Sequence, residues 1–149
     1  IGFRVTVNEF VHRYTGARID RVAGIEARGF IFGAALASHM GLGFVPIRKA
    51  GKLPRQTYRV DYSLEYGKDS VEIHKDALAA DDRVLLVDDV LATGGTATAA
   101  AQLIRACGAN LLVAARTGYA RPAEVQGAHR TSVVAMRPIR CSSRALVAS

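Results

Sequence analysis

Apolar and polar residues alternate along the chain with two periods, one typical of helices and the other typical of strands. Over the first third of the chain the pattern predicts a helix, a strand, a helix and a strand, at residues 3–14, 18–25, 30–41 and 43–49. Gly16 and Gly41 follow the two helical patterns as stop signals. The chain therefore begins with alternating helices and strands.

The pattern continues with a polar region, two strands and a helix. Residues 50–68 combine Gly, Pro and Tyr with polar side chains, which is typical of a long loop or a hairpin. Residues 69–78 alternate apolar and polar side chains, so we expect an exposed strand there. The apolar run within 81–90 is expected of a central parallel strand covered on both faces, and 96–108 is expected to be a helix. This order predicts an α/β fold with crossover connections.

Ligands of such a sheet gather at the carboxyl ends of its strands. The turns after Ile25, Ile47 and Val90 are therefore the candidate binding sites. The sequence shows no internal repeat, and its 149 residues suffice for a hydrophobic core. We therefore expect one domain over residues 1–149.

The turn after Val90, in "VLLVDDVLATGGT", has the composition of a phosphate cradle. Gly94 and Gly95 let successive backbone N–H groups converge on one anion at a helix N-terminus, and Thr93 and Thr96 add hydroxyl donors. No Walker-type Gly-Lys-Ser/Thr sequence and no G-x-G-x-x-G is present, which argues against an ATPase loop and a dinucleotide fingerprint. For the glycines alone, an ordinary helix cap is the alternative.

Two adjacent carboxylates, Asp88 and Asp89, end the apolar run just before this cradle. They would repel a phosphate, but they suit hydroxyl donors or a hydrated divalent metal. Donors for a phosphate next to acceptors for a diol describe a ribose 5-phosphate.

Four cations follow the other two strands. They are Arg28 after the first strand and Arg48, Lys49 and Lys52 after the second. For each residue alone a solvated basic loop is the alternative, but together they form a second anion site with more charge than a monophosphate needs. A phosphate, a diol and a polyanion in this order describe phosphoribosyl pyrophosphate, whose cleavage the cations and Mg²⁺ would assist.

Charge and composition argue against several other functions. The net charge is +7, but residues 105–149 carry seven Arg and a single acid, Glu124, so the basicity lies in the tail. No basic segment has interleaved aromatic residues, which argues against nucleic-acid binding. Cys107 and Cys141 are too few for a disulfide framework and fit a reducing cytosol. No apolar run reaches the ~20 residues of a membrane helix, and no signal-peptide pattern is present.

Several motifs resemble a known family. "VLLVDDVLATGGT" is similar to the signature of the type I phosphoribosyltransferases, and "VAGIEARGFIFGAALA", "VPIRKAGKLP" and "YSLEYGKDSVEIHKDAL" resemble the adenine phosphoribosyltransferases. The resemblance runs from about Phe3 to Asn110. It implies a mostly parallel sheet flanked by helices, with a flexible hairpin loop. It also implies a cytoplasmic homodimer that makes AMP and diphosphate from adenine and phosphoribosyl pyrophosphate, with Mg²⁺.

The same resemblance implies a role for each candidate residue. The 5-phosphate would be held by Ala92, Thr93, Gly94, Gly95 and Thr96, and the ribose hydroxyls by Asp88 and Asp89. Diphosphate contacts would come from Arg28, Arg48, Lys49 and Lys52, some of them across a dimer interface. Glu65 matches a general acid/base toward adenine, and Tyr66 matches a neighbour that closes over the site.

Two parts of the chain depart from the family pattern. No residue matches the family's N-terminal "hood", which contacts the purine, so we assign no adenine contact. Residues 111–149 form an atypical Arg-rich segment in which only "TSVVAM" is typical of a strand. We interpret this segment as a diverged terminus or as the product of a reading-frame change.

Three alternatives to an adenine enzyme stay open. The first is a phosphoribosyltransferase that prefers xanthine or another purine. The second is a non-catalytic regulator that binds phosphoribosyl pyrophosphate, although a regulator would not need the acid Glu65. The third is an inactive truncated form.

Overall fold

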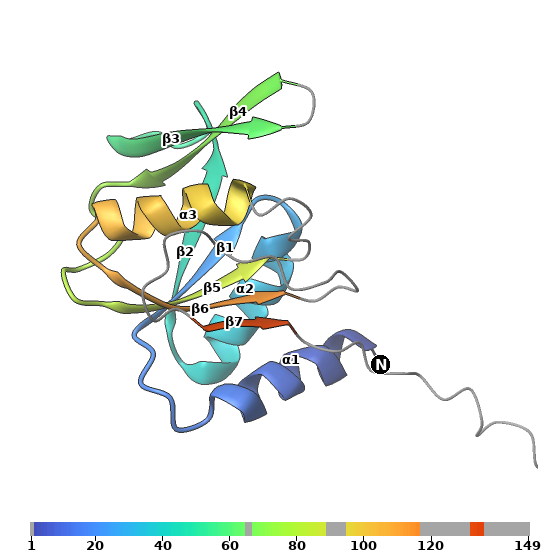
Figure 1. Cartoon of the computed structure of the whole chain (residues 1–149). Helices are drawn as coiled ribbons and strands as arrows, with labels where there is room; N and C mark the ends of the chain where they lie inside the picture. The colour runs from blue at the N-terminus through green and yellow to red at the C-terminus, as the bar shows by residue number, and fades with distance from the viewer. Residues whose placement is uncertain (1, 65–66, 89–94, 117–131, 136–149) are drawn as a thin grey trace, which may run out of the picture.

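A seven-stranded sheet lies at the centre of the described chain, with helices packed on both of its faces (Figure 1). The computed structural model describes residues 2–64, 67–88, 95–116 and 132–135. The strands are β1 (Arg21–Ile25), β2 (Gly43–Lys49), β3 (Thr57–Leu64), β4 (Gly67–His74), β5 (Arg83–Asp88), β6 (Asn110–Arg116) and β7 (Ser132–Ala135). The helices are α1 (Gly2–Tyr14), α2 (Arg28–Met40) and α3 (Gly95–Ala106). None of these described helices is long and apolar enough to cross a membrane.

The strands are arranged in the order β3-β4-β2-β1-β5-β6-β7. From β2 to β7 neighbouring strands are parallel, whereas β4 pairs antiparallel with both β2 and β3. Parallel pairing brings the carboxyl ends of β1, β2 and β5 to the same edge of the sheet. The predicted α/β fold with a mostly parallel sheet is confirmed.

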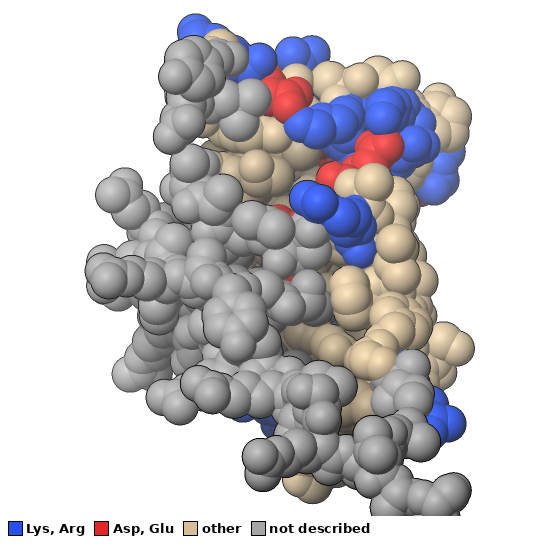
Figure 2. Space-filling view, turned by 90° about the vertical axis from the view of Figure 1, so that its right-hand side faces the viewer, with Lys and Arg blue, Asp and Glu red and all other residues tan. Residues whose placement is uncertain are grey.

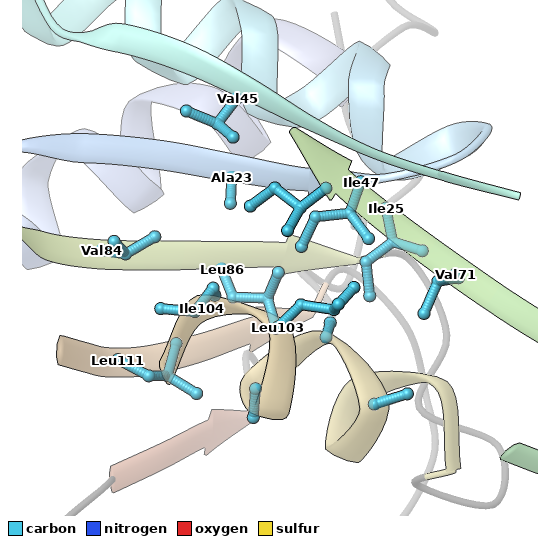
Figure 3. Packing of buried hydrophobic residues seen from close by; sticks show 14 of the residues in the cluster. Ala23, Ile25, Val45, Ile47, Val71, Val84, Leu86, Leu103, Ile104 and Leu111 are labelled. Carbon is cyan, nitrogen blue, oxygen red and sulfur yellow. The ribbon is translucent and has the colours of Figure 1, made fainter. Parts of the chain in front are cut away.

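β5 is buried on both faces, as its continuous apolar sequence predicts. Val84 and Leu86 belong to a hydrophobic cluster with α3, whereas Leu85 and Val87 belong to a second cluster with α1 and α2. Each of these four side chains is at most 1% exposed. Figure 3 shows Leu86 on the side of the sheet that α3 covers with Leu103. The central strand is therefore fixed between two helical layers.

The hairpin alternative for residues 50–68 is correct, because β3 pairs with β4 from Thr57 opposite His74 to Leu64 opposite Gly67. The two strands form one side of the sheet, and they lie at the top of the molecule in Figure 1.

The strand predicted over residues 69–78 is present as β4, which ends at His74, but the prediction that it is exposed is wrong. In β4 the four positions from Ser70 to Ile73 are buried, because β4 lies between β3 and β2 and its Val71 and Ile73 pack in the cluster with α3. On the other face Glu72, which is 8% exposed, accepts a hydrogen bond from the backbone N–H of Gly51 at 3.1 Å. The polar residue Glu72 of the alternating pattern is therefore a buried carboxylate with a hydrogen-bond donor.

The segment 111–149 contributes to the sheet. Most of β6 lies in it and pairs with β5, and β7 pairs with β6, both in parallel register. The expectation that only "TSVVAM" forms a strand in this segment is therefore wrong, because residues 111–116 belong to β6. β7 falls within "TSVVAM", the stretch for which the sequence predicts a strand. The sheet thus continues beyond its central strand on both sides.

Glycines let α2 approach β1 and β5 closely. A Cβ at Gly24 would lie 2.7 Å from the carbonyl oxygen of Gly29, and a Cβ at Gly29 would lie 2.7 Å from the carbonyl oxygen of Val87. Real Cβ atoms do not approach backbone oxygens so closely, so any side chain would displace the helix. The glycines therefore fix the start of α2 against the end of β5.

We expect Gly29→Ala to lower the free energy of unfolding by about 1–3 kcal/mol, the usual cost of overpacking a rigid contact. Gly2→Ala is the control, because nothing lies within 4 Å of a Cβ at that position. Urea unfolding measures both variants. A Gly29→Ala protein as stable as the wild type would contradict the close packing of α2 on β5.

Candidate functional site

Three parallel strands end together where the sequence places its candidate residues. Glu26 follows β1, β2 ends at Lys49 and β5 ends at Asp88, while α2 and α3 begin at Arg28 and Gly95. Figure 2 looks onto this edge, and Lys and Arg side chains gather in its upper part with carboxylates among them. The edge therefore carries opposite charges side by side.

Glu26 is the centre of a charged cluster at the ends of β1 and β2. Its carboxylate accepts hydrogen bonds from Arg48 Nε and Nη2, each at 3.3 Å, and from Lys52 Nζ at 2.7 Å. The backbone N–H of Lys49 donates a further bond at 3.1 Å. The Glu26 side chain is 14% exposed, whereas those of Arg48 and Lys52 are 33% and 48% exposed. The carboxylate is thus enclosed, and both cations keep a side open to solvent.

These partners keep Glu26 ionised. Burial by itself would raise its pKa, but the hydrogen bonds from Lys52, Arg48 and the Lys49 backbone, with the charge of Arg48, outweigh burial. Together they lower the pKa of Glu26 from 4.5 to about 2. At neutral pH the carboxylate therefore binds its cationic partners in its charged form.

The Lys49 side chain points away from Arg48, because successive residues of a strand face opposite sides of the sheet. Its ammonium group donates hydrogen bonds to the hydroxyl of Tyr62 at 3.1 Å and to the carboxylate of Asp69. The bond to Asp69 raises the pKa of Lys49 in spite of burial, and the same bond lowers the pKa of Asp69. The Lys49 ammonium therefore contacts the β3–β4 hairpin and not the Glu26 cluster.

The end of β5 and the start of α3 form the second part of the site. Asp88 is 8% exposed, and a Cβ at Gly29 would lie 3.5 Å from its Cα, so the end of β5 adjoins α2. Gly95 and Thr96, both half-buried, open α3. A helix N-terminus favours anions through its dipole and the N–H groups of its first turn.

Several predicted site residues lie outside the described residues, namely Glu65, Tyr66, Asp89, Ala92, Thr93 and Gly94. Those within the described residues are Arg28, Arg48, Lys49, Lys52, Asp88, Gly95 and Thr96. Arg28 is exposed and begins α2 two residues after Glu26, so it lies at the same edge as the cluster.

The chain matches the model of one protein family, the phosphoribosyl transferase domain, over residues 8–135. The matched range contains every described strand, α2 and α3, and thus all the elements that form the site. The chain belongs to the phosphoribosyltransferase family.

Relatives of this chain are named adenine phosphoribosyltransferases, as the resemblance predicts. The protein of Brucella ovis is 60% identical over 112 residues, which are 75% of this chain and 62% of the relative. The crystal structure of the Rhodothermus marinus protein aligns with a TM-score of 0.77 and 40% identity, over 89% of this chain and 76% of that one. The Trypanosoma brucei protein, in complex with AMP, pyrophosphate and ribose-5-phosphate, aligns with a TM-score of 0.72 and 36% identity, over 77% of this chain and 51% of that one. The chain spans 62% of the length of the curated relatives that it matches.

Sequence reasoning missed Glu26, whose carboxylate lies at the centre of the charge cluster. It stands in "GIEARGF", directly after a predicted strand. Parallel neighbouring strands end at the same edge, so an acid after one strand is placed to pair with the cations after the next. This signal was present in the sequence, since Arg48 ends the neighbouring apolar run.

We expect Glu26 to contribute stability that depends on pH. Because folding lowers its pKa from 4.5 to about 2, the contribution is fully present above pH 4.5 and is lost as the pH falls toward 2. Glu26→Gln should therefore lower the free energy of unfolding at neutral pH, and the difference from wild type should shrink below pH 4.5.

Urea unfolding at neutral and acid pH measures this difference. Asp61→Asn is the control, because it removes an exposed ion pair with Arg59. If the difference between Glu26→Gln and wild type is the same at neutral and acid pH, the charged cluster does not stabilise the fold.

Proposed function

We propose that this chain transfers the phosphoribosyl group of phosphoribosyl pyrophosphate to adenine, giving AMP and diphosphate in purine salvage. One observation carries the proposal. A helix N-terminus suited to a phosphate, the buried carboxylate Asp88 and a cation cluster suited to a diphosphate meet at one sheet edge. The Trypanosoma brucei relative supports it, because AMP and pyrophosphate in that complex are the two products of this reaction.

The cations would stabilise the leaving group. When the bond between sugar and diphosphate breaks, negative charge develops on the diphosphate and positive charge on the sugar. Arg28, Arg48 and Lys52 would bind the diphosphate oxygens and offset the negative charge as it forms. We assign Lys49 to the same group by its motif, and its ammonium would reach the diphosphate by leaving Asp69.

The start of α3 would hold the other end of the substrate. We assign the 5-phosphate to the backbone N–H groups and hydroxyls of residues 92–96, which lead into the helix. Asp88 and Asp89 would accept hydrogen bonds from the ribose hydroxyls. Their charges also favour the positive charge that develops on the sugar, as carboxylates do in glycoside chemistry.

The donors at this edge fit Mg²⁺. Asp88 supplies hard carboxylate oxygens at the end of β5, and Mg²⁺ in phosphate-transfer sites is usually held by one or two carboxylates together with substrate phosphates. We propose that the substrate carries the ion into the site, where it would lie near Asp88 and Asp89. When bound, Mg²⁺ would offset negative charge on the diphosphate.

Base activation is assigned to the hairpin between β3 and β4. We propose that Glu65 exchanges a proton with the adenine ring and that Tyr66 helps to exclude water from the sugar. Water must be excluded because it would otherwise hydrolyse the activated sugar.

We further propose that the chain forms a homodimer in the cytoplasm. Ile31 of α2 and Phe3 of α1 are 59% and 45% exposed, and the ring of Phe3 packs at a tilt against that of Phe32, with ring centroids 5.1 Å apart. Exposed apolar groups of this size favour burial against a partner. Some of the cations would then act in the partner's site.

Incubation of the chain with adenine, phosphoribosyl pyrophosphate and Mg²⁺ should yield AMP. Radiolabelled bases with product analysis measure this reaction. Product from xanthine but not adenine would change the base assignment, and binding without transfer to any purine would favour a regulator.

Asp88→Asn combined with Asp89→Asn should weaken phosphoribosyl pyrophosphate binding, because the ribose loses its charged acceptors. Calorimetry measures this affinity.

Glu65→Gln should lower kcat by about 100-fold or more, the usual contribution of general acid/base catalysis. The KM for phosphoribosyl pyrophosphate should change little, because the acid acts on the base. Glu9→Gln, at an exposed position of α1, is the control and should leave kcat unchanged. Equal losses in kcat and in substrate affinity would contradict the acid/base role of Glu65.

A further inference from the structure

The Glu26 cluster has a geometry that a simple patch of cations lacks. Arg48 and Lys52, two of the residues assigned to the diphosphate, both end on the same enclosed carboxylate. We propose that Glu26 is a positioning residue of the diphosphate site, which holds these two cations ready for the ligand. This inference deepens the proposed function and rests on it for the identity of the ligand.

Hydrogen bonds link Glu26, Arg48 and Lys52 in a closed ring. Arg48 binds Glu26 through Nε and Nη2, and its Nη1 donates to the carbonyl oxygen of Lys52 at 3.0 Å. Lys52 returns to Glu26 through its ammonium group, and the Lys49 N–H binds the same carboxylate. The turn after β2 is therefore attached to the turn after β1 by four hydrogen bonds to a single side chain.

A second carboxylate holds the same turn from β4. Glu72 lies opposite Arg48 in the pairing of β2 with β4, and it accepts the bond from the Gly51 N–H. Gly51 has a φ of 76°, a conformation in which residues with a Cβ are strained. The backbone of the turn is thus fixed at two points, at Lys49 by Glu26 and at Gly51 by Glu72.

A carboxylate is suited to this role because it resolves a conflict between the two cations. Arg48 and Lys52 repel each other, and without an anion between them their long side chains would separate in solvent. With Glu26 between them both are ordered, and each keeps N–H groups that do not bind Glu26 and a solvent-exposed side. Donors that are already ordered bind a developing charge without paying for their reorganisation at that moment.

A competing role predicts the opposite result. If Glu26 only screened the cations, its neutralisation would raise the positive potential of the edge and would tighten the binding of any polyanion. If Glu26 positions the cations, the same neutralisation releases them and weakens binding. The sign of the change therefore separates the two roles.

The test is calorimetric titration of the purified chain with inorganic diphosphate and Mg²⁺. We expect Glu26→Gln to raise the Kd of diphosphate by about tenfold or more, the effect of losing one charge-assisted hydrogen bond. Glu26→Asp, which keeps the charge on a shorter side chain, should restore part of the affinity. Asp76→Asn is the matched control, because it removes an exposed carboxylate that pairs with Arg55 at 2.5 Å.

Kinetics give a second readout that a general loss of stability would not produce. The KM for phosphoribosyl pyrophosphate should rise in Glu26→Gln, while the KM for adenine stays at the wild-type value. Unchanged or tighter diphosphate binding by Glu26→Gln would overturn the proposal, as would wild-type protein that binds no diphosphate. Because binding is measured without turnover, a wild-type chain that binds diphosphate but makes no AMP would refute the proposed transferase activity alone.

Discussion

The burial of β5 between two helical layers is the constraint on which the rest of the structure depends. Val84 and Leu86 need α3 on one face, and Leu85 and Val87 need α1 and α2 on the other. Of these helices, α2 and α3 start at the carboxyl edge of the sheet, where their N-termini favour anions. The packing that stabilises the core therefore also decides where anions can bind.

The alternating direction of side chains along β2 decides which charged groups meet at this edge. Arg48 and Lys49 are adjacent in sequence but face opposite sides of β2, so one joins Glu26 and the other joins Tyr62 and Asp69. The pKa of Glu26 is lowered and the pKa of Lys49 is raised, so both groups stay charged across the neutral range. The edge is thus built from paired charges, in which carboxylates accept hydrogen bonds from the neighbouring cations.

Much of the fold follows from the sequence alone, for physical reasons. The apolar run of β5 and the glycine stops of α1 and α2 depend on local composition, and the structure places these elements where the pattern predicts them. The exposure of β4 was predicted wrongly because alternation of apolar and polar residues identifies a strand but does not show what packs against its polar side chains. The buried Glu72 bonds to Gly51, a contact across 21 positions that no local pattern shows.

The candidate site divides in the same way. Residue types and spacing indicate Asp88 and the start of α3, because Asp88 ends the apolar run of β5 and the start of α3 is close to it in the sequence. The role of Glu26 and the separate direction of the Lys49 side chain depend on contacts among β1, β2, β3 and β4, which become visible only when the strand order is known. The sequence assigns no residue to base recognition, because none matches the hood of the family.

The most direct test of this account is a crystal structure of the chain with phosphoribosyl pyrophosphate and Mg²⁺. The account predicts that Arg48 and Lys52 bind the diphosphate while both remain hydrogen-bonded to Glu26, with the 5-phosphate on the first turn of α3. A diphosphate bound elsewhere, or Arg48 and Lys52 turned away from Glu26 toward the ligand, would contradict it.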